Sequence, residues 1–397
     1  MFEAAMSFQR HFGIAPTQTV RAPGRVELLG NHTDYNQGLV MALAVDKYIC
    51  MAGAPLADGE VELTSTAFPQ PTRFRLDAIE KDPAAPWANY VKGLLLQLRE
   101  RGVALGGFNA TIHSTIPLGA GLSSSAALLV ATALLARKLF PYSLQANGHP
   151  DGIPSFEAGG LRNLGSAERM AFAMMCQAAE NRFVGVNCGL LDHISSLYGR
   201  DNQVILIDCQ QLGVEWTPLA ADLEVVVCHS GVRHALVGGE YNDRRANCEA
   251  AAAALGAPSL RAVTLDTLTA DRAKLTPHQH ECALHVVGEI DRVQRGAALL
   301  RGGDLTGFGQ LLFESHASSR ENFHNSCPEL DILVDLARKE PACLGARLTG
   351  GGFGGATLNL VRRDDAEDFR TRIAEGYQQA TGRALESWVC RVVDGAA

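Results

Sequence analysis

A glycine- and serine-rich turn that stands directly before a helix is the strongest local constraint on this chain. The turn covers residues 117–125 and has the sequence PLGAGLSSS. The alternating residues 108–116 before it predict a strand, and the Ala/Leu-rich residues 126–140 after it predict a helix. A strand, a glycine turn and a helix in this order predict an anion-binding site at the start of the helix.

The chemistry of such a site follows from the backbone. The first N–H groups of a helix have no partner within it and carry the positive end of its dipole. Glycines let these groups approach a ligand, and three serine hydroxyls can add donors or a metal ligand. The pattern is not a Walker A loop, and no lysine stands beside it, so a triphosphate bound here needs a metal ion. The alternative is an N-capping serine after an ordinary turn.

The rest of the chain mixes predicted strands and helices. Its 397 residues predict two or three domains. Strands are predicted over residues 20–29 and 39–51, and a helix over 166–181. A further strand at 223–228 opens what we interpret as a second half. We therefore expect an α+β protein with two domains, residues 1–205 and 206–397.

Charge and cysteine usage exclude several classes of protein. The net charge is −8, with 35 Lys and Arg against 43 Asp and Glu and no basic run, which argues against a nucleic-acid partner. The longest apolar run, residues 126–136, is too short to span a bilayer. Ten scattered cysteines without a CxxC pair, and no secretory signal at the start, predict reduced thiols in the cytoplasm.

Two carboxylates are candidates for phosphoryl transfer, which requires positioned phosphates, Mg²⁺ and an aligned hydroxyl. Glu180, on the predicted helix 166–181, could bind Mg²⁺, which prefers oxygen ligands. Asp192 could accept a proton or orient the acceptor hydroxyl. Arg25, on a predicted strand, would keep a nearby Asp192 ionised. The alternatives are solvated or capping acids and a surface ion pair.

A second polar segment, residues 31–36 (NHTDYN), lies between two predicted strands. Its closely spaced amide, imidazole and carboxyl groups suit the capture of several hydroxyls. The alternative is a polar turn, because Asn, Asp and Gly are the residues that turns favour.

Three motifs together resemble one enzyme family. Residues 25–38 (RVELLGNHTDYNQG) resemble the galactokinase signature, residues 117–127 the phosphate loop of the wider GHMP small-molecule kinases, and residues 348–355 (LTGGGFGG) their third motif. The resemblance covers nearly the whole chain. It implies an N-terminal α+β domain, a C-terminal ferredoxin-like domain and an active site in the cleft between them. The implied reaction transfers the ATP γ-phosphoryl group to the C1 hydroxyl of galactose, with Mg²⁺ as cofactor.

The resemblance also implies a role for individual residues. Asp192 would be the catalytic acid/base carboxylate, with Arg25 as its cationic partner. Ser125 and Glu180 would hold Mg²⁺. The residues implied in sugar binding are Asn31, His32, Asp34, Gly189, Tyr241 and Gly351. Those implied in ATP binding are Ser65, Trp87, Gly119, Ala120, Gly121, Leu122, Ser123, Ser124 and Ser125.

The chain departs from the family at three positions. The family has Asn at position 27 and Glu at position 31, whereas this chain has Glu27 and Asn31. That Glu contacts the outer hydroxyl of the sugar in the family, so a kinase for N-acetylgalactosamine, arabinose or galacturonate is an alternative. The intact HTDYN segment favours galactose. His193 stands where the family favours Gln, and we interpret it as a hydrogen-bonded structural residue rather than one that acts on Asp192.

Besides a kinase for galactose and a kinase for a related sugar, a third hypothesis is a protein without catalytic activity. Some galactokinase-like proteins are sugar- and ATP-sensing regulators without turnover, and such sensors can lose residues from the serine loop. The complete serine turn, Glu180 and Asp192 favour catalysis. We expect galactose and ATP as partners and a monomer, with an oligomer left open.

Overall fold

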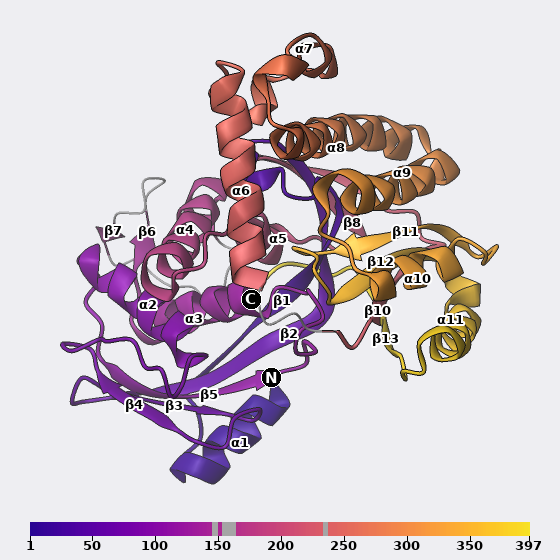
Figure 1. Cartoon of the computed structure of the whole chain (residues 1–397). Helices are drawn as coiled ribbons and strands as arrows, with labels where there is room; N and C mark the ends of the chain where they lie inside the picture. The colour runs from indigo at the N-terminus through magenta and orange to yellow at the C-terminus, as the bar shows by residue number, and fades with distance from the viewer. Residues whose placement is uncertain (145–149, 153–163, 233–236) are drawn as a thin grey trace.

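Two β-sheets organise the computed structural model, which describes residues 1–144, 150–152, 164–232 and 237–397 (Figure 1). The first sheet has seven strands in the order β4-β3-β5-β2-β8-β9, and β1 pairs with β2. Its strands are β1 (Gln18–Leu29), β2 (Leu39–Leu56), β3 (Glu60–Ser65), β4 (Thr72–Arg75), β5 (Gly107–Ser114), β8 (Gln203–Asp208) and β9 (Gly213–Pro218). A separate two-stranded ribbon consists of β6 (Ser143–Leu144) and β7 (Pro150–Gly152).

Helices cover both faces of the first sheet (Figure 1). Helix α1 (Phe2–Phe12) lies on one face, where Phe8 packs against apolar residues of β2. The helices α2 (Ala88–Glu100), α3 (Ser124–Leu139), α4 (Ser166–Ala178) and α5 (Leu191–Tyr198) lie on the other face. In α3 every residue from 126 to 137 is buried, because a helix that is apolar on all sides must lie inside the protein.

The second sheet has the ferredoxin-like topology that the family resemblance implies. Its strands are β10 (Leu223–His229), β11 (Cys343–Thr349), β12 (Ala356–Arg362) and β13 (Glu386–Cys390), in the order β11-β12-β10-β13. The first strand of this half thus lies between the third and the fourth, and all neighbours run antiparallel. The helices of this half are α6 (Val237–Ala254), α7 (Leu265–Ala270), α8 (Pro277–Gly302), α9 (Leu305–Ser318), α10 (Pro328–Ala337) and α11 (Ala366–Thr381).

The expected α+β fold class is confirmed, while the domain division at residue 205 stays a prediction. Both β8 and β9 pair within the first sheet, so the chain passes from one sheet to the other between Pro218 and Leu223. The last residues then return to the first half, where Val392 bridges to Val45. Strand β9 was not predicted, although the half-buried Val214 and Trp216 alternate with the exposed Gly213 and Glu215.

A buried network of charges joins the two halves. The Arg347 guanidinium on β11 is fully buried, and its Nη1 lies 3.3 Å from Glu27 Oε1 and 3.7 Å from Glu289 Oε2. Glu289 on α8 accepts hydrogen bonds of 2.9 Å from the backbone N–H groups of both Gly30 and Asn31. The network therefore fixes the turn that follows β1 against a helix and a strand of the second half.

Removal of the Arg347 guanidinium should destabilise the fold. We expect Arg347→Met to lower the free energy of unfolding by about 3–5 kcal/mol, because it removes the ion-pair partner of the buried Glu27 and leaves Glu289 with Arg292 alone. Urea denaturation measures this change. The matched control is Arg362→Met on β12, whose pair with Asp222 is about half exposed and should contribute less than about 1 kcal/mol. Equal losses in the two variants would contradict the account.

Candidate active site

One cavity of about 310 Å³ collects most of the residues that the sequence singles out. It lies where the end of β1, the start of α5 and the third glycine motif meet. The predicted site residues that line it are Arg25, Asn31, His32, Asp34, Ser125, Glu180, Gly189, Asp192, Tyr241 and Gly351.

The carboxylate of Asp192 is held by two groups from distant parts of the chain. The Arg25 guanidinium on β1 donates from Nε to Oδ1 at 2.7 Å, and its Nη2 also lies 2.7 Å from Oδ1. The Ser123 hydroxyl donates to Oδ2 at 2.6 Å. Asp192 lies in the first turn of α5, where the helix dipole favours a negative charge. The side chain is one-quarter exposed, so the carboxylate is both fixed and accessible from the cavity.

The phosphate-loop segment has the backbone geometry that its glycines predict. Gly119, Gly121 and Ser123 have positive φ angles of 79°, 67° and 57°. A Cβ atom at Gly121 would lie 3.0 Å from the carbonyl oxygen of Thr349, so glycine allows the turn to lie directly against the third glycine motif. Arg25 Nη1 also donates to the Gly121 carbonyl at 2.6 Å, which ties the turn to the same arginine that holds Asp192.

The polar segment 31–36 contributes a neutral histidine to the cavity wall. Burial lowers the pKa of His32 to about 4, so the ring carries no charge at neutral pH. Its Nε2 lies 3.1 Å from the Gly351 carbonyl and donates to it, and Nδ1 accepts from the Tyr35 hydroxyl at 2.8 Å. The Tyr241 ring lies 5.0 Å from the His32 ring. The segment is thus joined to the third glycine motif.

Asp34 is a half-buried carboxyl group on the cavity wall, and its pKa is raised. Burial, together with the nearby Asp192 and Glu27 carboxylates, raises its pKa from 3.8 to about 7. It lies directly against Gly189, where any Cβ atom would collide with its carboxyl oxygen. Only glycine at position 189 therefore leaves room for Asp34 to face the cavity.

Positions 27 and 31, at which this chain has Glu and Asn where the family has Asn and Glu, still bring one carboxyl group and one amide into contact. Asn31 Nδ2 donates to Glu27 Oε1 at 3.1 Å and to the Gly350 carbonyl at 2.9 Å. Its Oδ1 accepts from Asn325 Nδ2 at 2.9 Å. Both ends of the Asn31 amide are therefore engaged within the protein, while Glu27 also lines the cavity. Burial raises the pKa of Glu27, and Arg347 opposes that shift.

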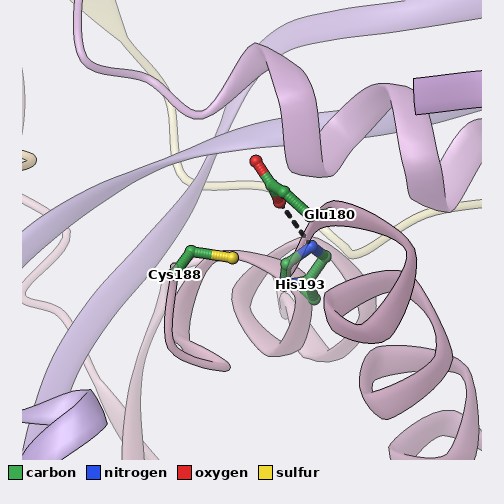
Figure 2. Close-up of side chains that lie close together, drawn as sticks. All are labelled: Glu180, Cys188 and His193. Carbon is green, nitrogen blue, oxygen red and sulfur yellow. Dashed lines mark ion pairs between the residues drawn. The ribbon is translucent and has the colours of Figure 1, made fainter. Parts of the chain in front are cut away.

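Glu180 lies on a π-helical segment, Ala179–Val184, that continues α4. Such segments are rare and frequently occur at functional sites. Figure 2 shows Glu180 together with Cys188 and His193, and Glu180 Oε2 lies 3.0 Å from His193 Nε2. Burial and Glu180 raise the pKa of the Cys188 thiol. Glu180 and Ser125 both border the cavity with oxygen atoms, which are the ligands that a divalent cation such as Mg²⁺ prefers.

The proposed nucleotide-binding residues lie outside this cavity except Ser125. Ala120 and Leu122 are buried, and the Ser65 hydroxyl accepts from the Ala67 N–H at 3.2 Å. Trp87 stacks on Phe68, with ring centroids 5.7 Å apart and planes inclined by 2°. Their role in ATP binding stays a prediction, as do those of Gly119, Gly121, Ser123 and Ser124.

Sequence reasoning missed Asn325, which nothing in its local sequence marks as functional. The expectation that His193 is a hydrogen-bonded structural residue is met only in part. Its Nε2 lies 3.0 Å from Glu180 Oε2, while Nδ1 has no hydrogen bond with any residue that the structure describes. The ring is fully buried and faces Glu180 rather than Asp192.

Comparison with known proteins identifies the family. Three family models match: the galactokinase galactose-binding signature over residues 6–55, the GHMP kinases N terminal domain over 89–150 and the GHMP kinases C terminal over 297–379. A galactokinase of Roseiflexus sp. is 42% identical over 393 residues, which cover 98% of this chain and 94% of that protein. The Homo sapiens galactokinase is 40% identical, and the match covers 99% and 95% of the two chains.

The chain belongs to the galactokinase family of the GHMP kinases. The resemblance stated from its three motifs is thereby confirmed.

A solved galactokinase has the same fold. The Lactococcus lactis galactokinase complexed with galactose superposes with a TM-score of 0.88 and 29% identity, covering 99% of this chain and 98% of that one. A mevalonate kinase with a TM-score of 0.62 and 16% identity shares the fold alone. Among the described residues, no helix has both the length and the apolar character needed to cross a bilayer.

The raised pKa of Asp34 predicts a pH-dependent cost to stability. Its unfolded pKa is near 3.8 and its folded pKa about 7, so the folded state binds the proton more tightly. The stability that the protonated Asp34 contributes to the folded state is fully present below pH 3.8 and is lost as the pH rises to about 7. Asp34→Asn should therefore raise Tm relative to the unsubstituted protein, by an increment that grows from pH 4 to 7 and then levels off. Thermal unfolding across this range measures the increment, and one that does not change with pH would rule out the shift.

Proposed function

We propose that this member of the galactokinase family transfers the γ-phosphoryl group of ATP to the C1 hydroxyl of galactose, giving galactose 1-phosphate and ADP. The observation that carries the proposal is the Asp192 carboxylate, held by Arg25 and by Ser123 of the glycine–serine turn at the wall of the cavity. The names of the full-length relatives support the same activity.

Asp192 is proposed to accept or orient the proton of the C1 hydroxyl as that oxygen attacks the γ-phosphorus. Its two carboxylate oxygens accept hydrogen bonds from Arg25 and Ser123, which fix the orientation of the group before the sugar binds. Arg25 holds Asp192 by a 2.7 Å charged hydrogen bond and offsets negative charge on the transferring phosphoryl group. Movement of Ser123 toward a phosphate would free one carboxylate oxygen for the hydroxyl.

The sugar is proposed to occupy the cavity beside Asp34, His32 and Tyr241. Asp34 would accept hydrogen bonds from ring hydroxyls, with Gly189 leaving the space that it needs. Tyr241 offers an apolar ring face. Asn31 and Gly351 contribute chiefly by fixing the wall, because both are already hydrogen-bonded within the protein.

Glu27 is proposed to take the outer C6 hydroxyl in place of the Glu that the family has at position 31. Glu27 lines the cavity and contacts Asn31. The cavity wall therefore keeps a carboxylate beside the position where the family has its Glu. A carboxylate at this wall would repel the C6 carboxylate of galacturonate, which favours a neutral sugar.

Ser125 and Glu180 fit Mg²⁺ as a hydroxyl and a carboxylate that border one cavity. When bound, this ion neutralises charge on the phosphates. The turn residues Gly119, Ala120, Gly121, Leu122, Ser123 and Ser124 are proposed to bind the phosphates through their backbone, with Ser65 and Trp87 near the adenine. A cytoplasmic location and a monomeric state stay predictions.

Substitution of the proposed base tests the assignment. Asp192→Asn should lower kcat for galactose at least about 100-fold, because the amide cannot accept the proton, while leaving galactose affinity within a few-fold. Coupled ADP release gives kcat, and calorimetry gives the affinity. The control is Asp208→Asn, a similarly exposed acid paired with Arg261 outside the cavity, which should retain activity. Normal turnover in the Asp192 variant would reject Asp192 as the base.

The sugar preference tests the role of Glu27. Arabinose lacks the C6 hydroxymethyl group, so it cannot use a C6 contact. Glu27→Gln should reduce the galactose-to-arabinose ratio of kcat/KM by roughly 10-fold or more, the effect of one charged hydrogen bond. Because general damage from the lost Arg347 contact lowers both rates alike, the ratio is diagnostic. An unchanged ratio would show that Glu27 does not select the C6 group.

A further inference from the structure

Three side chains with different donor atoms converge beside the cavity. Glu180 Oε2, Cys188 Sγ and His193 offer one ligand atom each, and these atoms all lie within 4.8 Å of one another. In Figure 2 the three side chains point toward a common centre. They come from the π-helical segment, the loop after it and the first turns of α5. We infer that this group, the Glu180–Cys188–His193 cluster, binds a soft divalent cation of the Zn²⁺ type.

The separations suit tetrahedral coordination. Zinc binds carboxylate, imidazole and thiolate ligands at 2.0–2.3 Å, which places ligand atoms about 3.3–3.8 Å apart around the ion. Glu180 Oε2 and His193 Nε2 are already 3.0 Å apart. No separation in the cluster exceeds 4.8 Å, which is about 1 Å above the upper end of these spacings. The open side of the cluster, where Glu180 and Cys188 border the cavity, leaves the fourth position for water.

The imidazole supplies an independent sign that a ligand is missing. His193 is fully buried; its Nε2 contacts Glu180 Oε2 at 3.0 Å, and within the described parts of the chain no hydrogen bond reaches Nδ1. A buried polar atom without a partner costs about 1–3 kcal/mol, so native proteins rarely retain one without a reason. A cation bound between Nε2 and the Glu180 carboxylate would replace their direct contact with two metal–ligand bonds.

The surrounding contacts hold Cys188 in place through its backbone. Gln177 Nε2 donates to the Cys188 carbonyl at 3.1 Å, and the Cys188 N–H donates to Asn181 Oδ1 at 3.2 Å. These bonds do not involve the sulfur, whose own contact is a 3.2 Å hydrogen bond to Asn181 Oδ1. The loop therefore stays in place when the thiol changes partner, and a Cys188→Ala variant should fold.

The donor set selects the ion. Thiolate and imidazole ligands favour zinc and related ions, whereas Mg²⁺ prefers six oxygen ligands and seldom binds sulfur. As the metal–sulfur bond forms, the thiol proton passes to solvent, and the neutral imidazole contributes a nitrogen lone pair. If the proposed function holds, Zn²⁺ at the cluster engages the same Glu180 carboxylate that is proposed to hold Mg²⁺, and we expect it to inhibit phosphorylation.

Cobalt substitution tests the site without reference to activity. The full-length, metal-free protein is titrated with Co²⁺, and the near-ultraviolet thiolate-to-cobalt charge-transfer band is recorded. We expect one equivalent of Co²⁺ to produce the band, Zn²⁺ to abolish it by displacement, and Cys188→Ala to lack it. His193→Gln should weaken Co²⁺ binding at least about tenfold.

The matched control is Cys343→Ala, another partly exposed cysteine, which lies at the start of β11 in the second sheet. This variant should retain the band. No band in the unsubstituted protein, a band that persists in Cys188→Ala, or a band lost in Cys343→Ala would each overturn the proposal. Circular dichroism confirms that each variant is folded.

A kinetic experiment tests whether the Zn²⁺ cluster and the proposed Mg²⁺ site share Glu180. At fixed Mg²⁺ and buffered free Zn²⁺, the unsubstituted protein should lose galactose phosphorylation at a Zn²⁺ concentration at least about tenfold below that needed for Cys188→Ala, each relative to its own zinc-free rate. Equal sensitivity would overturn the overlap. If no galactose is phosphorylated at all, the proposed function fails, and the cobalt band still decides the metal site.

Discussion

The carboxylate of Asp192 is the point on which the arrangement of the site depends, because three remote segments meet there. Arg25 comes from β1, Ser123 from the turn before α3, and Asp192 from the start of α5. A carboxyl group that is three-quarters buried needs hydrogen-bond donors, and these two residues provide them. Arg25 also bonds to the turn through the Gly121 carbonyl, so one guanidinium sets the position of the acid relative to the phosphate loop.

The two halves of the protein are joined by close backbone contacts and by buried charge. The third glycine motif lies against the glycine–serine turn at a separation that only glycines permit. On the other side of the cavity, Glu289 and Arg347 hold the turn at Asn31. A change in the angle between the sheets would therefore move the Asn31 turn and the glycine–serine turn together.

Local patterns in the sequence predicted much of the fold. The apolar β1 and β2, the Ala/Leu-rich α3 and the glycine turn before it follow from residue type and period. The candidate site was predicted in part, because catalytic groups occur in short motifs whose chemistry is recognisable. Arg25, Asp34 and Asp192 were selected for their chemistry, and the structure brings all three to one cavity.

What the sequence could not predict depends on contacts between distant residues. Glu289 and Asn325 bond to Asn31 from positions 258 and 294 residues away, and neither stands in a recognisable motif. The π-helical segment depends on packing around Glu180 that local propensity does not encode. For the same reason the sequence could not predict that His193 faces Glu180. Strand β9 forms because β8 offers it an edge.

A structure of the full chain with galactose, Mg²⁺ and a non-hydrolysable ATP analogue tests the central claim most directly. The account predicts that the C1 hydroxyl of the sugar lies within hydrogen-bonding distance of an Asp192 carboxylate oxygen and in line with the γ-phosphorus. Arg25 should remain on the opposite carboxylate oxygen. A sugar whose C1 hydroxyl points away from Asp192, or that binds outside the cavity, would contradict it.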